Sequence, residues 1–185
     1  MKDAQITRIV AVDVKSGESG YAVFETPLRL VDWGLKGEKG YIGNARCIAD
    51  LLALFQPSVV VMLRIATNSK RNSVSVRRTV QAVRGEARRA SLPVAIVSER
   101  AAKTFFERQG FRTRHEIASA LAASFPELAW KLPPHRKMWQ TEYARLSIFD
   151  AVSLALTYFA RHGISIALSR DDGAEGAEFF RRSLR

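Results

Sequence analysis

Two aspartates stand in apolar surroundings, and each needs a group that neutralises its charge. Asp13 lies near the end of the almost uninterrupted apolar stretch 6–14, and Asp150 lies within the apolar stretch 143–162. Burying a bare carboxylate costs on the order of several kcal/mol unless it is paired, hydrogen-bonded or bound to a cation. We therefore expect each aspartate to meet a basic side chain, a hydrogen-bond donor or a metal ion.

Two buried acids on distant elements are most simply explained by a cation that both of them face. Hard oxygen ligands favour Mg²⁺ or Mn²⁺. Two such ions about 4 Å apart could activate a water and stabilise the leaving oxygen of a phosphodiester. This chemistry predicts Asp13 and Asp150 as catalytic residues and metal ligands, with Glu142 as a further catalytic acid. Two alternatives stay open, a helix-start charge for Glu142 and a hydrogen bond to a core donor for Asp150.

Basic residues gather in the middle third of the chain. The net charge is +11 over 185 residues, and the segment 64–114 holds 13 Lys or Arg against three Glu. A clustered basic surface is typical of proteins that bind polyanions, most often nucleic acid. On the helix expected at 74–90, three arginines share one face, for which phosphate contact and simple solvation are the alternatives. The predicted nucleic-acid-binding residues are Arg64, Lys70, Arg71, Arg77, Arg78, Arg84, Arg88, Arg136, Lys137 and Trp139.

The last three of these residues belong to a loop that mixes basic and aromatic side chains. Trp130 and Lys131 stand at its start, and Pro133 and Pro134 interrupt it. Such a loop can stack bases and hold phosphates, or it can cover the core through its tryptophans. The residues leave both interpretations open.

The hydrophobic pattern predicts an α/β scaffold with a mixed five-stranded sheet and flanking helices. Short connections between the first three strands favour an antiparallel meander, and crossover helices favour two further parallel strands. A helix that is apolar on nearly every side is expected to be buried. We expect one domain over 1–163 and a peripheral tail over 164–185. The expected strands are 6–14, 21–25, 28–35, 59–63 and 92–97, and the expected helices are 45–55 (capped by Asn44), 74–90, 99–108 (capped by Ser98), 115–124 and 143–162.

Targeting and redox signals favour a cytoplasmic protein. No window has the roughly 18 apolar residues of a membrane span, and the first strand begins without a signal-peptide apolar region. The single cysteine, Cys47, excludes an internal disulfide, and its apolar helical setting favours an inert core thiol.

Three features of the chain belong together: Ile-Val-Ala-Val-Asp at 9–13 followed by Ser-Gly-Tyr-Ala-Val-Phe at 19–24, the order of the elements, and Phe-Asp-Ala-Val-Ser-Leu-Ala-Leu at 149–156. In these features the chain resembles the RNase H-like superfamily and, within it, the RuvC-type Holliday junction resolvases. The resemblance spans roughly residues 6–162. It implies a metal-dependent endonuclease that cleaves structured or branched DNA, with Asp13 and Asp150 as its first and last catalytic acids.

The chain departs from the family pattern at two positions. Where the family places a glutamate after its fourth strand, residues 62–65 read Met-Leu-Arg-Ile, with Arg64 near the expected acid. The acid one turn before the last aspartate corresponds to Ser147. Glu142 or Glu99 would have to substitute for these acids. Arg64 could instead occupy the metal's place as a built-in cation and pair with Asp13.

Three functions follow from this comparison. The first is a metal-dependent endodeoxyribonuclease, or a catalytically weakened relative, acting on structured DNA. The second is a non-catalytic nucleic-acid-binding module in which Arg64 neutralises the acids. The third, a small-molecule phosphotransferase, needs two such domains around a cleft, so we expect no nucleotide cofactor. Symmetric junction cutting requires two sites, which makes a homodimer a candidate assembly.

Overall fold

The computed structural model describes residues 8–65, 73–134 and 144–168. Five strands form one mixed sheet in the order β3-β2-β1-β4-β5. β1 (Ile9–Asp13), β2 (Ser19–Thr26) and β3 (Arg29–Lys36) are antiparallel, while β4 (Val59–Leu63) and β5 (Val94–Val97) continue the sheet in parallel with β1. The expected fold class is confirmed. The helices are α1 (Gly40–Phe55), α2 (Val74–Arg89), α3 (Glu99–Glu107), α4 (Arg114–Ser124), the 3₁₀ helix η1 (Pro126–Lys131) and α5 (Leu146–Arg161).

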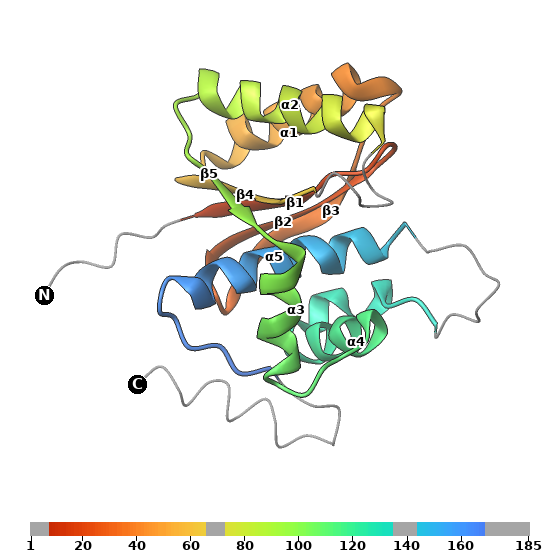
Figure 1. Cartoon of the computed structure of the whole chain (residues 1–185), viewed down its shortest axis with the longest axis vertical. Coiled ribbons are helices and arrows are strands. Elements are labelled where there is room, and N and C mark those ends of the chain that lie inside the picture. The colour runs from red at the N-terminus through yellow and green to blue at the C-terminus, as the bar shows by residue number, and fades with distance from the viewer. Residues whose placement is uncertain (1–7, 66–72, 135–143, 169–185) are drawn as a thin grey trace, which may run out of the picture.

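Helices cover both faces of the sheet (Figure 1). α1 and α2 lie on one face, and α5 lies on the other with α3 and α4 beyond it. Every residue of β1 is buried because the strand has a helical layer on each side. Alternate β1 side chains enter opposite layers, so Val10 and Val12 pack toward α1 and α2, whereas Ile9 and Ala11 pack toward α5. The same alternation places Asp13 on the α5 side.

The parallel pairing of β1 with β4 brings their carboxyl ends to one edge of the sheet. Asp13 ends β1 at this edge, Leu63 ends β4 beside it, and Glu99 begins the helix that follows β5. In open α/β sheets, ligands bind outside the carboxyl ends of the strands. The fold therefore positions any site at this edge.

Among the element boundaries, the start of α1 differs most from the expected one. α1 begins at Gly40 instead of after Asn44, because the buried Asn44 side chain accepts a hydrogen bond from the Glu38 N–H at 3.0 Å and anchors the chain that enters the helix. The segment 164–168, expected in the peripheral tail, contributes Ile166 to the core, and Leu168 N–H donates to Gln109 Oε1 at 3.0 Å. The division into one domain over 1–163 and a tail over 164–185 stays a prediction, and residues 169–185 lie outside the described part.

A capping box fixes the start of α4. The Thr113 hydroxyl accepts from the Glu116 N–H at 3.2 Å, while Glu116 Oε2 accepts from the N–H groups of Thr113 at 2.9 Å and Arg112 at 2.7 Å. These backbone donors stabilise the carboxylate and lower the pKa of Glu116. Arg114 is the first helical residue after the N-cap residue Thr113, so the cap sets where the Arg114 side chain leaves the helix.

In the three described ranges, no helix combines the length and the apolar character that crossing a membrane requires.

Gly20 tests the close packing of β2 against α5. A Cβ at Gly20 would overlap the backbone carbonyl of Ser147, whereas a Cβ at Gly17 would meet nothing within 4 Å. We expect Gly20→Ala to lower the free energy of unfolding by about 3 kcal/mol or more, since backbone cannot move aside as a flexible side chain can. Gly17→Ala is the matched control and should unfold near the wild-type temperature. Equal melting temperatures for the two variants would contradict the packing.

Glu116→Gln tests the cap of α4 through its pH dependence. A carboxyl whose pKa is lowered by folding stabilises the fold above its unfolded pKa, and that contribution is lost as pH falls through the folded value. The melting temperature of Glu116→Gln should therefore lie below that of wild type at pH 7, and the gap should close as pH falls below the ordinary value of 4.5. Glu127→Gln, at an exposed position of η1, controls for the loss of one negative charge. A gap that stays constant with pH would contradict the role of the carboxylate.

Candidate functional site

Asp13 is fully buried and is held by two neighbours of different kinds. Its Oδ2 accepts a hydrogen bond from the Ser147 hydroxyl at 2.8 Å and lies 2.9 Å from Lys15 Nζ. Lys15 follows Asp13 by only two residues, just beyond the end of β1. The Asp13 carboxylate at the end of β1 is thus neutralised by Lys15, a residue of the segment that follows the same strand.

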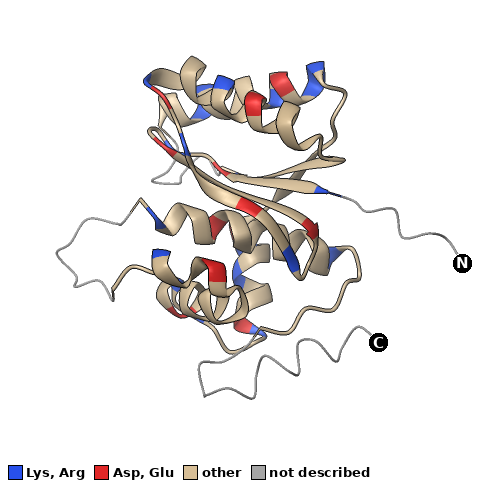
Figure 2. Cartoon of the chain, turned by 180° about the vertical axis from the view of Figure 1, so that it is seen from behind, with Lys and Arg blue, Asp and Glu red and all other residues tan. Residues whose placement is uncertain are grey.

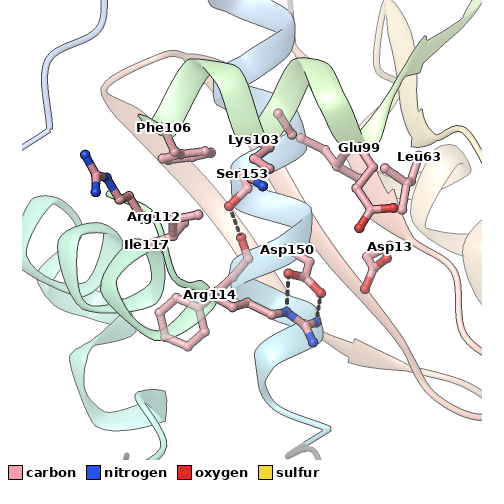
Figure 3. Close-up of a pocket in the computed structure, with 13 residues that line it drawn as sticks. Asp13, Leu63, Glu99, Lys103, Phe106, Arg112, Arg114, Ile117, Asp150 and Ser153 are labelled. Atoms are coloured by element: carbon pink, nitrogen blue, oxygen red, sulfur yellow. Dashed lines mark hydrogen bonds and ion pairs between the residues drawn. The ribbon is translucent and has the colours of Figure 1, made fainter. Parts of the chain in front are cut away.

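Asp150 meets a second cation from another helix. Arg114 Nε donates to Asp150 Oδ1 at 2.9 Å, and Arg114 Nη2 donates to Oδ2, which makes the pair bidentate (Figure 3). Lys15 Nζ also lies 3.7 Å from Asp150 Oδ2. Asp150 is only partly buried, less than its apolar helix predicts, because it faces a cavity. The structure therefore brings Asp13 and Asp150 to one ammonium group.

Ser147 joins three elements at this site. Its hydroxyl oxygen accepts from the Gly20 N–H at 2.9 Å while its proton is donated to Asp13, so β2, β1 and α5 meet at one buried side chain. The resemblance implies an acid at this position. The structure has the neutral Ser147 hydroxyl there, and the hydrogen bond that this hydroxyl donates occupies a lone pair of Asp13.

Arg64 does not pair with Asp13, and that expectation is wrong. In β4, Val60 and Met62 point toward α1 and α2, while Val61 and Leu63 point toward α5. Arg64 lies beyond the last residue of β4, and its side chain is exposed, whereas Asp13 is fully buried. The Arg64 backbone N–H donates to the Val97 carbonyl at 2.7 Å.

A cavity of about 240 Å³ opens beside the two acids, between α3, α4 and α5 (Figure 3). Its inner wall is apolar, and its charged residues include both acids and bases. Glu99, one of the acids that could replace a missing ligand, lines it on the side of Asp13. The apolar lining is Leu63, Ala102, Phe106, Ile117, Phe149 and Leu154, and the charged lining is Asp13, Glu99, Lys103, Arg112, Arg114 and Asp150.

The side chains at this site do not fit the expected two-ion centre. Within residues 8–65, 73–134 and 144–168, no three His, Cys, Asp or Glu side chains gather as a metal-binding group. Asp13 and Asp150 bring two negative charges, and Lys15 and Arg114 bring two positive ones. Glu142 lies outside the described residues. The assignment of Asp13 and Asp150 as metal ligands stays a prediction.

The outer face of α2 carries the basic surface expected from the sequence. Arg77, Arg78, Arg84 and Arg88 are all exposed, and Figure 2 shows basic residues along the helix layer that faces away from α5. The Arg78 guanidinium lies 5.6 Å from the centroid of the Tyr41 ring. Of the other predicted binding residues, Lys70, Arg71, Arg136, Lys137 and Trp139 lie outside the described part of the chain.

Trp130, at the start of the basic and aromatic loop, combines features of both earlier interpretations. It packs edge-to-face on Trp33 of the edge strand, with ring centroids 5.7 Å apart, as a core cover would. Yet it is 67% exposed, and Lys131 Nζ lies 3.9 Å from its ring centroid. Both alternatives stay open for this tryptophan.

Sequence reasoning missed both cations that hold the acids. Lys15 had a usable signal, since only one residue separates it from Asp13. Arg114 had none, because 36 residues separate it from Asp150 and only the packing of α4 against α5 brings the two together.

No protein-family model matches the chain, and no curated protein matches its sequence. Solved structures do match. The RuvC of T. thermophilus in complex with a Holliday junction substrate is 18% identical, with a TM-score of 0.60 over 85% of this chain and 96% of that one. A second Thermus thermophilus RuvC structure is 16% identical, with a TM-score of 0.61 over 85% and 97% of the two chains. The fowlpox virus Holliday junction resolvase is 16% identical, with a TM-score of 0.51 over 84% and 99%.

The aligned regions take in nearly the whole of each resolvase chain, and the likeness in three dimensions persists at low sequence identity. The mixed sheet and the helices on both of its faces agree with the resemblance that the sequence motifs carry. This chain has the RNase H-like fold of the RuvC-type Holliday junction resolvases.

Proposed function

We propose that this chain acts on branched DNA as a catalytically weakened relative of the RuvC-type endonucleases, which binds its substrate while hydrolysis is weak or lost. The observation that carries the proposal is the environment of Asp13. Its partners are the Ser147 hydroxyl and the Lys15 ammonium, at a site where a two-metal nuclease needs further carboxylates. Arg64 and Ser147 stand at the two positions for which the resemblance implies acids.

Two observations support branched DNA as the ligand. The similar structures include a T. thermophilus RuvC and a fowlpox virus resolvase, each described with Holliday junction DNA. The exposed arginines of α2 supply positive charge on the helix layer that covers the face of the sheet opposite α5. The only acid in the sequence of α2, Glu86, pairs with Arg89, which leaves the charges of Arg84 and Arg88 for phosphates.

A second candidate is a metal-dependent nuclease that works as a homodimer, with one site for each strand it cuts. It is favoured by one observation, that Lys15 Nζ lies within 4 Å of both Asp13 and Asp150. Acids this close to one cationic atom could share a divalent ion. This candidate requires Lys15 and Arg114 to leave the acids and a further carboxylate, such as Glu99 or Glu142, to join them. Under either candidate we propose the cytoplasm as the place of action.

The arginines of α2 should set the salt dependence of binding. Each phosphate contact contributes about 0.9 to the slope of log affinity against log salt on duplex DNA, so Arg84→Gln with Arg88→Gln should reduce the slope for a four-way junction by about 1.8. Fluorescence anisotropy at several salt concentrations measures it. The control is Arg29→Gln, which removes a 71% exposed cation at the β2–β3 turn and should leave the slope nearly unchanged. An unaltered slope in the α2 variant would remove these arginines from the interface.

Junction cleavage in Mn²⁺ separates the two candidates. For the weakened relative, we expect wild type to bind a labelled four-way junction and to cleave it no faster than Asp13→Asn does. The asparagine keeps the shape of Asp13 and its hydrogen bond to Ser147 while removing the charge that a metal would need. Cleavage by wild type that Asp13→Asn abolishes would favour the metal-dependent nuclease.

A further inference from the structure

We propose that Lys15 and Arg114 are built-in counter-ions that take the place of divalent cations at the acidic site, so that the chain folds and binds branched DNA without metal. The part about DNA rests on the proposed function. The part about the site rests on contacts within the chain.

Lys15 stands in the geometric relation to the two acids that a shared cation would have. Its Nζ lies 2.9 Å from Asp13 Oδ2 and 3.7 Å from Asp150 Oδ2. The Asp13 side chain is 1% exposed, so bulk water contributes little to stabilising its charge. An exposed ion pair contributes little to stability, but removing one partner of a buried pair leaves a costly isolated charge. The contact between Lys15 and Asp13 therefore behaves as a buried ion pair.

Arg114 supplies the second positive charge from an independent element. Its guanidinium donates two hydrogen bonds to Asp150, one to each carboxylate oxygen, which fixes the orientation of that carboxylate. The capping box of Thr113 and Glu116 sets the start of α4 immediately before this side chain. Asp150 thus lies between an arginine from α4 and the lysine after β1, and the four charges balance.

A divalent ion would meet three obstacles at this site. It would have to displace Lys15 and Arg114 from the carboxylates, and both cations would then remain nearby and repel it. It would also compete with the Ser147 hydroxyl, which already donates to Asp13 Oδ2. No third carboxylate of the described residues completes a metal-binding group here. Lys15 and Arg114 already balance the charges of Asp13 and Asp150 without any metal ion.

The experiment compares melting temperatures in EDTA and in Mn²⁺ for wild type and for variants that remove one charge each. Lys15→Met and Arg114→Met delete the proposed counter-ions while keeping much of their apolar length. Lys103→Met is the matched control, because Lys103 lines the same cavity but pairs with Glu107 at 3.6 Å and is 66% exposed. Asp13→Asn in the Lys15→Met background tests whether the unbalanced charge of Asp13, and not the changed shape of residue 15, lowers the melting temperature.

We expect wild type to melt at the same temperature in EDTA and in Mn²⁺. Lys15→Met should melt roughly 5–15 °C lower in EDTA and regain about 5–10 °C in Mn²⁺ at about 100 times its dissociation constant, because the exposed acids can then bind the ion. Asp13→Asn should restore most of the loss in that background. Arg114→Met should show the same pattern to a smaller degree, and Lys103→Met should show neither effect.

Stabilisation of wild type by Mn²⁺ that Asp13→Asn abolishes would overturn the proposal, and so would a Lys15→Met protein that loses no stability. If Lys15→Met fails to fold, direct titration of wild type with Mn²⁺ decides, since saturable binding at Asp13 contradicts built-in counter-ions and the absence of such binding supports them.

Junction affinity of wild type is measured in parallel in EDTA and in Mg²⁺. Equal affinities support metal-free binding, and affinity that requires Mg²⁺ overturns it. A chain that is indifferent to metal yet binds no junction would refute the proposed function while leaving the counter-ions in place.

Discussion

The buried charge of Asp13 is the constraint on which the site depends. A carboxylate at the end of a central strand, with helices on both faces of the sheet, must be neutralised within the protein. Lys15 and the Ser147 hydroxyl do this together, and Lys15 extends the arrangement to Asp150. The site is therefore one charge-balanced group drawn from β1, the segment after it, α4 and α5.

The surrounding fold is built to allow this contact. α5 crosses the sheet closely enough for the Ser147 hydroxyl to reach both Asp13 and the Gly20 N–H, and only glycine leaves room for the α5 backbone at that point. On the other side, the cap of α4 places Arg114 where it meets Asp150. The fold thus brings Asp13 and Asp150 to one place while Lys15 and Arg114 supply the positive charge.

Local pattern predicted the scaffold well because strands and helices differ in the period of their buried positions, about two residues against about 3.6. The apolar run of β1, the crossover helix before β4 and the apolar final helix were enough to predict the five-stranded sheet and to place Asp13 near Asp150. The main error concerns Arg64, which lies beyond the last residue of β4. Its side chain is exposed, whereas Asp13 is fully buried, and the strand pattern does not fix the direction of a residue past the strand end. Arg114 depends on how α4 packs against α5, and no spacing in the sequence encodes that contact.

A crystal structure of the wild-type protein soaked in Mn²⁺ tests the central claim most directly, because Mn²⁺ scatters anomalously and would reveal its own position. The account predicts no anomalous peak between Asp13 and Asp150, with Lys15 Nζ still within hydrogen-bonding distance of Asp13. A Mn²⁺ ion bound by both carboxylates, with Lys15 and Arg114 turned away, would contradict it.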